Sequence, residues 1–405
     1  MKKNNKTPKL RFSGYTDDWE QRKFKELCDM VTVGIANSAT HAYSDSGIVM
    51  FRNQNIKPNF LDDTDIIHIN PEFEVKYKNK RLRKNDLLVA RTGYPGTACV
   101  VPGKYENSQT FTTLIARPKK RVNSYFLCQY LNSDVGVKYF ESTQIGGGQK
   151  NSGAGILNEM PVTLPPAAEE EKRIADFFTQ LDHLITLHQH KLEKLQNMKK
   201  SCLQKMFPKD GATVPEIRFS EFQGDWEERT LGSCFDERLE SLPDGELLSV
   251  TIGSGIKKFS ELDRHDNSNT DKSKYKRVCI GDIAYNSMRM WQGASGRSPY
   301  EGIVSPAYTV VKPIGDIDTQ FFAYMFKKKE IIHLFEINSQ GLTSDTWNLK
   351  YPAFSKIVVR VPRNVEEQSR IARFLLELDE LISCTEQEIE ITKRMKKGCL
   401  QKMFV

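Results

Sequence analysis

The sequence predicts an α+β fold in which two mixed α/β domains are joined by two long helices packed as an antiparallel coiled coil, with a pseudo-two-fold internal repeat. The first observation behind this prediction is that the hexapeptide CLQKMF occurs twice, at 202–207 and at 399–404. Each copy closes about five heptads whose apolar residues recur at steps of three and four, which is typical of a long helix packed on another helix. Short apolar runs typical of strands lie before each of these segments.

The head of the chain is repeated as well. The segment PKLRFSGYTDDWE at 8–20 resembles PEIRFSEFQGDWE at 215–227. The heads are 207 residues apart and the hexapeptides are 197 residues apart, so the chain contains one unit in two copies. The part between head and hexapeptide is ten residues longer in the first copy. This organisation predicts six segments: an N-terminal segment at 1–20, a first domain at 21–160, a central helix at 165–207, a linker with the second head at 208–227, a second domain at 228–357 and a C-terminal helix at 362–405.

The composition permits a polyanionic partner without requiring one. Lys and Arg number 59 against 52 Asp and Glu, a formal net charge of +7 on 405 residues, and a charge of this size is usually solvated surface. Eight cysteines without a C-x-x-C pair, and no apolar stretch after the charged N-terminus, predict an intracellular chain with free thiols. No apolar run approaches ~18 residues, so we expect no membrane span.

The two long helices carry the apolar residues expected at their interface. An acidic run at 169–171 and a capping box of Asn364 with Glu367 predict where the helices begin. His188 and Lys199 interrupt the first apolar seam. The residues predicted for helix pairing and partner docking are Ile174, Phe177, Phe178, Leu181, Ile185, Leu192, Ile371, Phe374, Leu375, Leu378, Ile382 and Ile389.

Antiparallel pairing is favoured because the second domain must span the way back between two helices of equal length. At ~1.5 Å per residue each helix is roughly 55–60 Å long, so this pairing would hold the two domains at opposite ends. The alternative is that each helix is buried against its own globular domain. Apolar residues beside the seam widen the apolar face and predict further protein partners.

The two domains, at 21–160 and 228–357, are both predicted to be mixed α/β with short strands. The expected strands are DLLVAR, ACVVP and TLIAR in the first domain and DIAYNS, YTVVKP and KIVVRV in the second. Helical stretches, SYFLCQYLNSDVGVKYF and TQFFAYMFKKKEIIHLF, lie at matching places in the two copies.

Polar residues gather at turns that recur at equivalent places of the two domains. Forked donors, amides, hydroxyls and Gly backbone amides are the groups that DNA base edges and phosphates require. The alternative for each loop alone is an ordinary polar loop or a flexible Gly linker. The residues predicted to contact DNA are Arg91, Thr92, Tyr94, Gln149 and Lys150 in the first domain and Asn286, Arg289, Trp291, Gln292, Arg297, Thr343 and Ser344 in the second.

Signals for catalysis are weak throughout the sequence. There is no P-loop, and Gly253 and Gly255 lack the third Gly and the downstream acid of a nucleotide or methyl-donor site. The run 74–76 after Asp65 resembles a nuclease acid-x-Lys pair, but the pattern is too short to be specific. The histidines of the first long helix lack the spacing of metal ligands. We therefore expect a non-catalytic chain without catalytic residues, metal or cofactor of its own.

The repeat architecture resembles the specificity (S) subunit of type I restriction-modification systems, HsdS. The resemblance rests on LPPAAEEEKRIADFF at 164–178 and VPRNVEEQSRIARFL at 361–375, each following a divergent domain. The runs LLVARTGYPGTACVVP and GDIAYNSMRMWQGASG are similar to target-recognition domains of that family. One departure is Glu171, where the family pattern carries a Gln like Gln368, and this puts a local contact in doubt.

The resemblance implies a DNA-binding, bacterial cytoplasmic subunit in which each domain reads one half of a bipartite double-stranded site. It implies two methyltransferase (M) subunits that use S-adenosylmethionine for adenine-N6 DNA methylation, and two restriction (R) subunits that use ATP and Mg²⁺. Two other interpretations remain: a methyltransferase or nuclease with degenerate motifs, and a two-headed scaffold that binds only proteins.

Overall fold

The structure is a computed structural model of the chain. The structure describes residues 7–37, 39–143, 152–209, 211–253, 255–263, 265, 268–343 and 346–405. These divide into two compact units, Met1–His190 with Gln387–Val405, and Lys191–Glu386. Among the described residues, none of the helices is long and apolar enough to cross a membrane.

The first unit is built on two four-stranded sheets with orders β2-β11-β8-β9 and β10-β4-β7-β3, and two smaller pairs, β1-β12 and β5-β6. Its strands are β1 (Glu20–Lys23), β2 (Cys28–Val33), β3 (Tyr43–Ser44), β4 (Ile48–Phe51), β5 (Ile56–Lys57), β6 (Phe60–Leu61), β7 (Ile67–Ile69), β8 (Leu87–Val89), β9 (Ala98–Val100), β10 (Gln109–Thr110), β11 (Leu114–Pro118) and β12 (Pro161–Leu164). Its short helices are α1 (Phe24–Leu27), α2 (Pro71–Glu74), α3 (Ser124–Asn132), α4 (Asp134–Ser142) and α5 (Ala154–Glu159).

The second unit contains a four-stranded sheet with order β14-β21-β18-β19 and the pairs β13-β22, β15-β16 and β17-β20. Its strands are β13 (Glu227–Thr230), β14 (Phe235–Glu237), β15 (Leu248–Thr251), β16 (Gly255–Lys258), β17 (Lys276–Val278), β18 (Ile283–Asn286), β19 (Ser295–Arg297), β20 (Gly302–Val304), β21 (Tyr308–Pro313) and β22 (Val358–Val361). Its short helices are α7 (Leu231–Cys234), α8 (Thr319–Met325), α9 (Lys329–Ile337) and α10 (Tyr351–Phe354).

The central antiparallel sheet of each unit is buried on both faces. In β11, Leu114 and Ala116 pack into one core cluster, whereas Ile115 between them packs into another. In the second unit, Val311 and Val310 of β21 divide in the same way. Successive side chains of a strand point to opposite faces, so apolar runs such as TLIAR and YTVVKP form central strands with two cores. All six predicted strands are confirmed, and both predicted helical stretches are present as pairs, α3 with α4 and α8 with α9.

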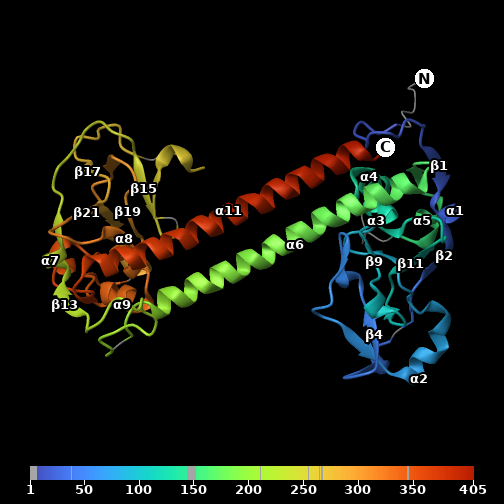
Figure 1. Ribbon diagram of the computed structural model, residues 1–405, viewed down its shortest axis with the longest axis horizontal. Coiled ribbons are helices and arrows are strands. Elements are labelled where there is room, and N and C mark those ends of the chain that lie inside the picture. The colour runs from blue at the N-terminus through green and yellow to red at the C-terminus, as the bar shows by residue number, and fades with distance from the viewer. Residues whose placement is uncertain are drawn as a thin grey trace. The chain divides into compact units, whose positions relative to one another are not determined.

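Two long helices, α6 (Ala168–Lys205) and α11 (Val365–Met403), are shared between the units. In the first unit, the beginning of α6 lies beside the end of α11 and the two run antiparallel (Figure 1). Asp182 pairs with Lys396, and His188 lies 3.7 Å from Glu388 further along α6. In the second unit, Lys199 near the end of α6 pairs with Asp379 of α11.

The repeated hexapeptide ends in a phenylalanine that fills the core of each unit. Phe404 stacks on Phe178 with ring centroids 5.8 Å apart and meets Phe126 of α3 at 5.5 Å. Phe207 stacks on Phe321 of α8 at 5.2 Å. Because buried aromatic pairs contribute beyond their buried area, each hexapeptide fastens the end of a long helix to a sheet domain.

The repeated head segments lock the start of each long helix. Arg11 forms a two-point ion pair with the buried Glu170 at 2.6 and 2.8 Å, and Arg218 pairs with Glu367 in the same way, both distances being 2.8 Å. The predicted capping box of Asn364 with Glu367 is wrong in its second half. Asn364 accepts a hydrogen bond from the Glu366 backbone, but the Glu367 carboxylate is taken by the arginine of the head.

Seven of the twelve residues predicted for helix pairing are buried, and the others are half-buried. The buried ones are Ile174, Phe178, Leu181, Ile371, Leu375, Leu378 and Ile389, and the half-buried ones are Phe177, Ile185, Leu192, Phe374 and Ile382. Phe177 and Phe374 pack edge-on against the head residues Phe12 and Phe219. They therefore serve the head segments rather than a free docking face.

Candidate functional site

The turn after β8 presents the first group of predicted contact residues. Tyr94 is 84% exposed at the tip of this turn, and Thr92 is half-buried beside it. Arg91 is held back, because its backbone N–H donates to Asn53 Oδ1 at 2.8 Å and its Nε donates to the Ser152 carbonyl at 3.2 Å. Tyr94 is therefore the most accessible of the three, and Arg91 supports the turn.

A cavity of about 670 Å³ lies under this turn. Its walls combine Thr92 and Tyr94 with Asn53, Gln54 and Lys57 from the segment after β4. The Asn53 amide also donates to Thr112 Oγ1 at 3.2 Å, which fixes this wall. Aromatic, amide, hydroxyl and ammonium groups thus face one hollow, a combination able to contact base edges and phosphates.

The loop between β18 and β19 presents the second group. Arg289 is exposed, and Trp291 and Gln292 of the 3₁₀ turn η6 (Met290–Gln292) are half-buried. The loop is internally braced, because the Asn286 side chain accepts from the Met288 backbone at 3.0 Å and Trp291 Nε1 donates to the Met288 carbonyl at 3.1 Å. The guanidinium of Arg289 is thereby carried on a rigid turn.

A second loop packs against this one. Trp347 meets Trp291 edge-on with ring centroids 5.3 Å apart, and Gln340 and Asn348 exchange backbone hydrogen bonds at the base of the loop. Thr343 is exposed near its tip, and its backbone N–H donates to Thr346 Oγ1 at 3.1 Å. The structure therefore brings Arg289, Trp291 and the loop of Thr343 into one surface.

Not every predicted contact residue joins these surfaces. Arg297 turns to α8, where its Nε donates to Thr319 Oγ1 at 3.1 Å. It lines a different cavity, of about 780 Å³, with Lys199 and Asp379. Gln149, Lys150 and Ser344 lie outside the described residues.

Sequence reasoning missed three residues that shape these loops. Asn53 lies far from Arg91 in the sequence, so only the fold reveals their contact. Trp347 lies in the polar run NSQGLTSDTWN at 338–348, where a tryptophan is a signal of packing. Lys327 is half-buried, and its ammonium donates to the carbonyls of Ile252, Gly293 and Ser295 at 3.0, 2.6 and 2.8 Å. It ties the end of α8 to the loop of Trp291, and burial lowers its pKa to about 8.

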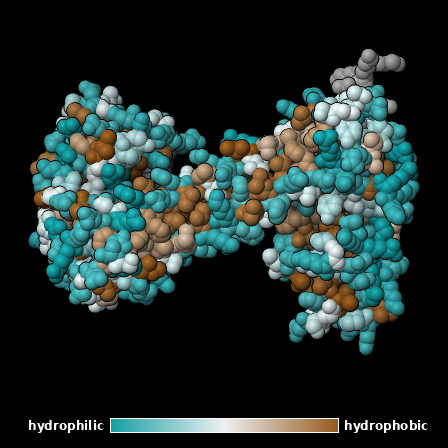
Figure 2. Space-filling model, viewed as in Figure 1, coloured by the Kyte–Doolittle hydropathy of each residue, from teal (hydrophilic) through white to brown (hydrophobic). Residues whose placement is uncertain are grey.

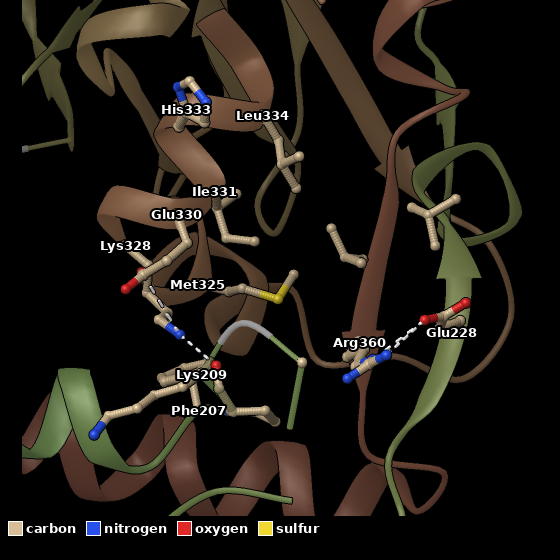
Figure 3. Close-up of a pocket in the computed structure, with 14 residues that line it drawn as sticks. Phe207, Lys209, Glu228, Met325, Lys328, Glu330, Ile331, His333, Leu334 and Arg360 are labelled. Atoms are coloured by element: carbon tan, nitrogen blue, oxygen red, sulfur yellow. Dashed lines mark hydrogen bonds and ion pairs between the residues drawn. The ribbon is translucent and has the colours of Figure 1, made fainter. Parts of the chain in front are cut away.

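The cavity in Figure 3 lies where the chain leaves α6 and has a volume of about 270 Å³. Lys328 donates to the Pro208 carbonyl at 2.9 Å, and Arg360 pairs with Glu228 at 2.9 Å. Both cations are thus bound by the chain itself. The contacts fix the linker after Phe207 and assemble no set of acid, base and nucleophile.

The weak catalytic signals do not form a site in the described part of the chain. Glu74 is fully buried and bound by Arg81 at 2.6 Å and Gln109 at 2.7 Å, and the hydrogen bond from Arg81 lowers the pKa of Glu74. His188 lies 3.7 Å from a single carboxylate, that of Glu388. No cluster of three or more His, Cys, Asp or Glu residues suited to a metal ion occurs among the described residues. These groups are structural.

Known proteins similar to this chain share one family. Residues 16–197 match the family model described as "Type I restriction modification DNA specificity domain". A Methanocaldococcus jannaschii protein described as a type I restriction enzyme MjaX specificity subunit is 22% identical over 406 residues, covering 94% of this chain and 91% of the relative.

Solved structures have a similar fold. The crystal structure of a type I restriction-modification S subunit from M. genitalium superimposes with a TM-score of 0.63 at 16% identity, covering 98% of this chain and 99% of the other. A chain from a structural study of complex assembly and conformational transition of the type I R-M system gives a TM-score of 0.50 at 14% identity, covering 95% and 97%. The mixed helix and sheet architecture is therefore that of these subunits.

Proposed function

We propose, from the premise that the chain belongs to the family of type I restriction-modification specificity subunits, that it reads a bipartite double-stranded DNA site without itself being a catalyst. Each unit would read one half-site. The observation that carries this proposal is that both units build a polar, partly aromatic loop surface at the end of a central sheet with the same strand order, although the loops differ in sequence.

In the first unit, DNA contact is assigned to the turn of Thr92 and Tyr94 with the adjacent Asn53 and Lys57. Tyr94 offers an aromatic face and a hydroxyl, and Lys57 a charge for phosphate. In the second unit, Arg289 offers a forked donor of the kind that pairs with guanine O6 and N7, and Gln292 an amide of the kind that pairs with adenine. The remaining candidates for contact with the DNA backbone are Gln149, Lys150, Arg297, Thr343 and Ser344.

The long helices would form an antiparallel spacer with a pseudo-two-fold relation between the two domains. The antiparallel contacts found inside each unit support this arrangement. A rigid spacer predicts half-sites separated by about one helical turn of DNA, as in other two-headed readers. The gap between half-sites would then be a property of the helices rather than of the loops.

The partners proposed are two methyltransferase subunits and two restriction subunits. They would supply S-adenosylmethionine-dependent adenine-N6 methylation and ATP- and Mg²⁺-dependent cleavage, so that this chain needs no cofactor. The surface seen in Figure 2 is mostly hydrophilic with small hydrophobic patches. Leu184, Leu187, Leu381 and Met395 are exposed on the long helices and are candidates for docking these subunits. The complex would work in the bacterial cytoplasm.

The test is a methylome of the source cell with and without this gene, read by single-molecule sequencing. We expect N6-methyladenine to disappear at one asymmetric bipartite motif and to return when the gene is restored. Restoration with a hybrid whose residues 21–160 come from another recognition domain should change one half-site and keep the other. An unchanged methylome in a cell with an active methyltransferase subunit would refute the proposal and favour a protein-binding scaffold.

A further inference from the structure

Asp379 of α11 holds three elements of the second unit together. Its Oδ1 pairs with the ammonium of Lys199 on α6. Its Oδ2 accepts a hydrogen bond from the Tyr324 hydroxyl at 2.8 Å, and Tyr324 belongs to the domain helix α8. One carboxylate therefore joins both long helices to the sheet domain.

Asp182 of α6 does the same in the first unit. Its Oδ1 pairs with Lys396 of α11. Its Oδ2 accepts from Gln129 Nε2 of α3 at 3.1 Å. The two arrangements are reciprocal, because the aspartate lies on α6 in one unit and on α11 in the other.

The donors from the two domains occupy the same position. Gln129 is the sixth residue of α3, and Tyr324 is the sixth residue of α8. An amide in one copy and a phenol in the other reach the corresponding carboxylate oxygen. The two domains have diverged in side chain at this position, and both have kept a hydrogen-bond donor there.

Each donor lies one turn along its helix from the aromatic contact described above. Phe126 meets Phe404, and three residues later Gln129 meets Asp182. Phe321 meets Phe207, and three residues later Tyr324 meets Asp379. Residues three apart share one face of a helix. The start of each domain helix also contacts a long helix, through Asn123 with Glu171 and Asp318 with Gln368. The aspartate contact adds a point one turn beyond the aromatic contact and restrains the tilt of the domain there.

The two donors are buried, since Gln129 and Tyr324 are only 3% and 7% exposed, whereas the side chains of Asp182 and Asp379 are 31% and 36% exposed. Hydrogen bonds to an ionised carboxylate are roughly twice as strong as neutral ones. Burial, together with the nearby carboxylate, also raises the pKa of Tyr324. The phenol therefore keeps its proton and stays a donor.

We propose that Asp182 and Asp379 are positioning residues that fix the tilt of each recognition domain on the long helices, and thereby the half-site spacing that the complex accepts. This inference rests on the proposed function. It assigns the choice of bases to the loops and the tolerance in spacing to these two carboxylates.

The test removes only the hydrogen bond between the domain helix and the aspartate of the long helix. Tyr324→Phe deletes the hydroxyl and leaves the ion pair of Lys199 with Asp379, and Gln129→Met is its counterpart in the first unit. Tyr351→Phe is the matched control, because its hydroxyl donates at 2.8 Å to the Phe235 carbonyl within the same domain.

The first readout needs neither DNA nor partners. Spin labels at Cys384, which is exposed on α11, and at Leu239→Cys, exposed in the domain, report their distance distribution by pulsed electron resonance. The half-buried Cys202, Cys279 and Cys399 are replaced by alanine in this background. We expect the distribution to broaden for Tyr324→Phe and to match the parent for Tyr351→Phe.

The second readout uses the chain in complex with the methyltransferase subunits of its source cell. A plasmid library carries the two half-sites with spacers from two base pairs shorter to two longer than the native one. Methylation at altered spacers, relative to the native spacer, should rise about tenfold for Tyr324→Phe and for Gln129→Met, with the same bases selected.

Unchanged distance distributions, or unchanged spacer preference in both variants, would overturn the inference. If the parent complex methylates no bipartite motif, the proposed function fails, and the distance measurement by itself then decides whether the carboxylates fix the tilt.

Discussion

The side chain of Glu171 accepts a hydrogen bond from the backbone N–H of Asn123 at 3.1 Å. Gln368 makes the corresponding contact in the second unit, where its Oε1 accepts from the Asp318 backbone, also at 3.1 Å. The departure from the family pattern at Glu171 therefore keeps this contact. Gln368 also donates to the Pro362 carbonyl at 3.2 Å, and an ionised carboxylate cannot make that second bond.

Glu171→Gln should stabilise the first unit by about 1 kcal/mol at neutral pH. The amide supplies a donor toward the Pro165 carbonyl and removes a buried charge, and one hydrogen bond is worth roughly 1 kcal/mol. Urea unfolding of the two proteins measures the gain. Gln368→Glu is the reciprocal control and should lower stability.

The gain from Glu171→Gln should depend on pH. Burial raises the pKa of Glu171, so the folded chain holds a proton at pH values where the unfolded chain, with a carboxyl pKa of about 4.3, has lost it. The stability that the Glu171 carboxyl contributes to the parent is therefore fully present below the unfolded pKa, and it is lost as pH rises through the folded pKa. The difference in free energy of unfolding between Glu171→Gln and the parent should grow as pH rises between these two pKa values and level off above the folded one. A difference independent of pH would contradict this account.

Replacing the head tryptophans should have unequal effects. Trp226 Nε1 donates to Glu367 at 3.2 Å, whereas the buried Nε1 of Trp19 has no hydrogen-bond partner among the described residues. Both phenylalanine substitutions leave a similar cavity, but only Trp226→Phe also removes a donor from a buried carboxylate. We expect Trp226→Phe to cost about 1–2 kcal/mol more than Trp19→Phe. Equal losses in urea unfolding would show that the Trp226 hydrogen bond contributes nothing.

The turn of Tyr94 depends on two glycines in different ways. Gly96 has φ +92°, and a Cβ there would lie 2.2 Å from the Phe140 ring. Gly93 has φ +76° with open space around it. Gly93→Ala should cost about 1 kcal/mol from the backbone alone, and Gly96→Ala should cost several times more. Thermal unfolding compares them, and equal costs would mean that Phe140 moves aside freely.

The exposed loops should carry affinity for DNA without carrying stability. In the assembled complex, Tyr94→Ala and Arg289→Ala should each weaken binding of the native site by at least about tenfold, because each removes one base or phosphate contact. Their melting temperatures should stay near that of the parent. Binding is measured at two salt concentrations, and variants that bind like the parent at both would remove these residues from the interface.

The sequence pattern predicted the features that repeat locally. The apolar runs predicted the central strands, because a run such as LLV supplies both faces of a buried sheet. The hexapeptides predicted where the long helices end, within a few residues. The departure at Glu171 was visible in the sequence, although the retained contact was not.

Long-range contacts could not be predicted in this way. Arg91 contacts Asn53 across 38 residues, and Gln129 contacts Asp182 across 53. The capping-box pattern predicted a local role for Glu367, but the half-buried Arg218 from a head 149 residues away binds its carboxylate instead. Periodicity reports which face of an element is buried, and it carries no information about which distant side chain reaches that face.

The exposure of Tyr94 at the end of a rigid turn bears on how such a protein can evolve. A residue that lies outside both cores can be exchanged at little thermodynamic cost, since substitutions at exposed positions usually change stability by less than about 0.5 kcal/mol. The aromatic contacts of Phe207 and Phe404 and the ion pairs of the heads stay in place meanwhile. Under the proposed function, new DNA sequence preferences can therefore arise by substitutions at the exposed loop tips while the folded structure is kept.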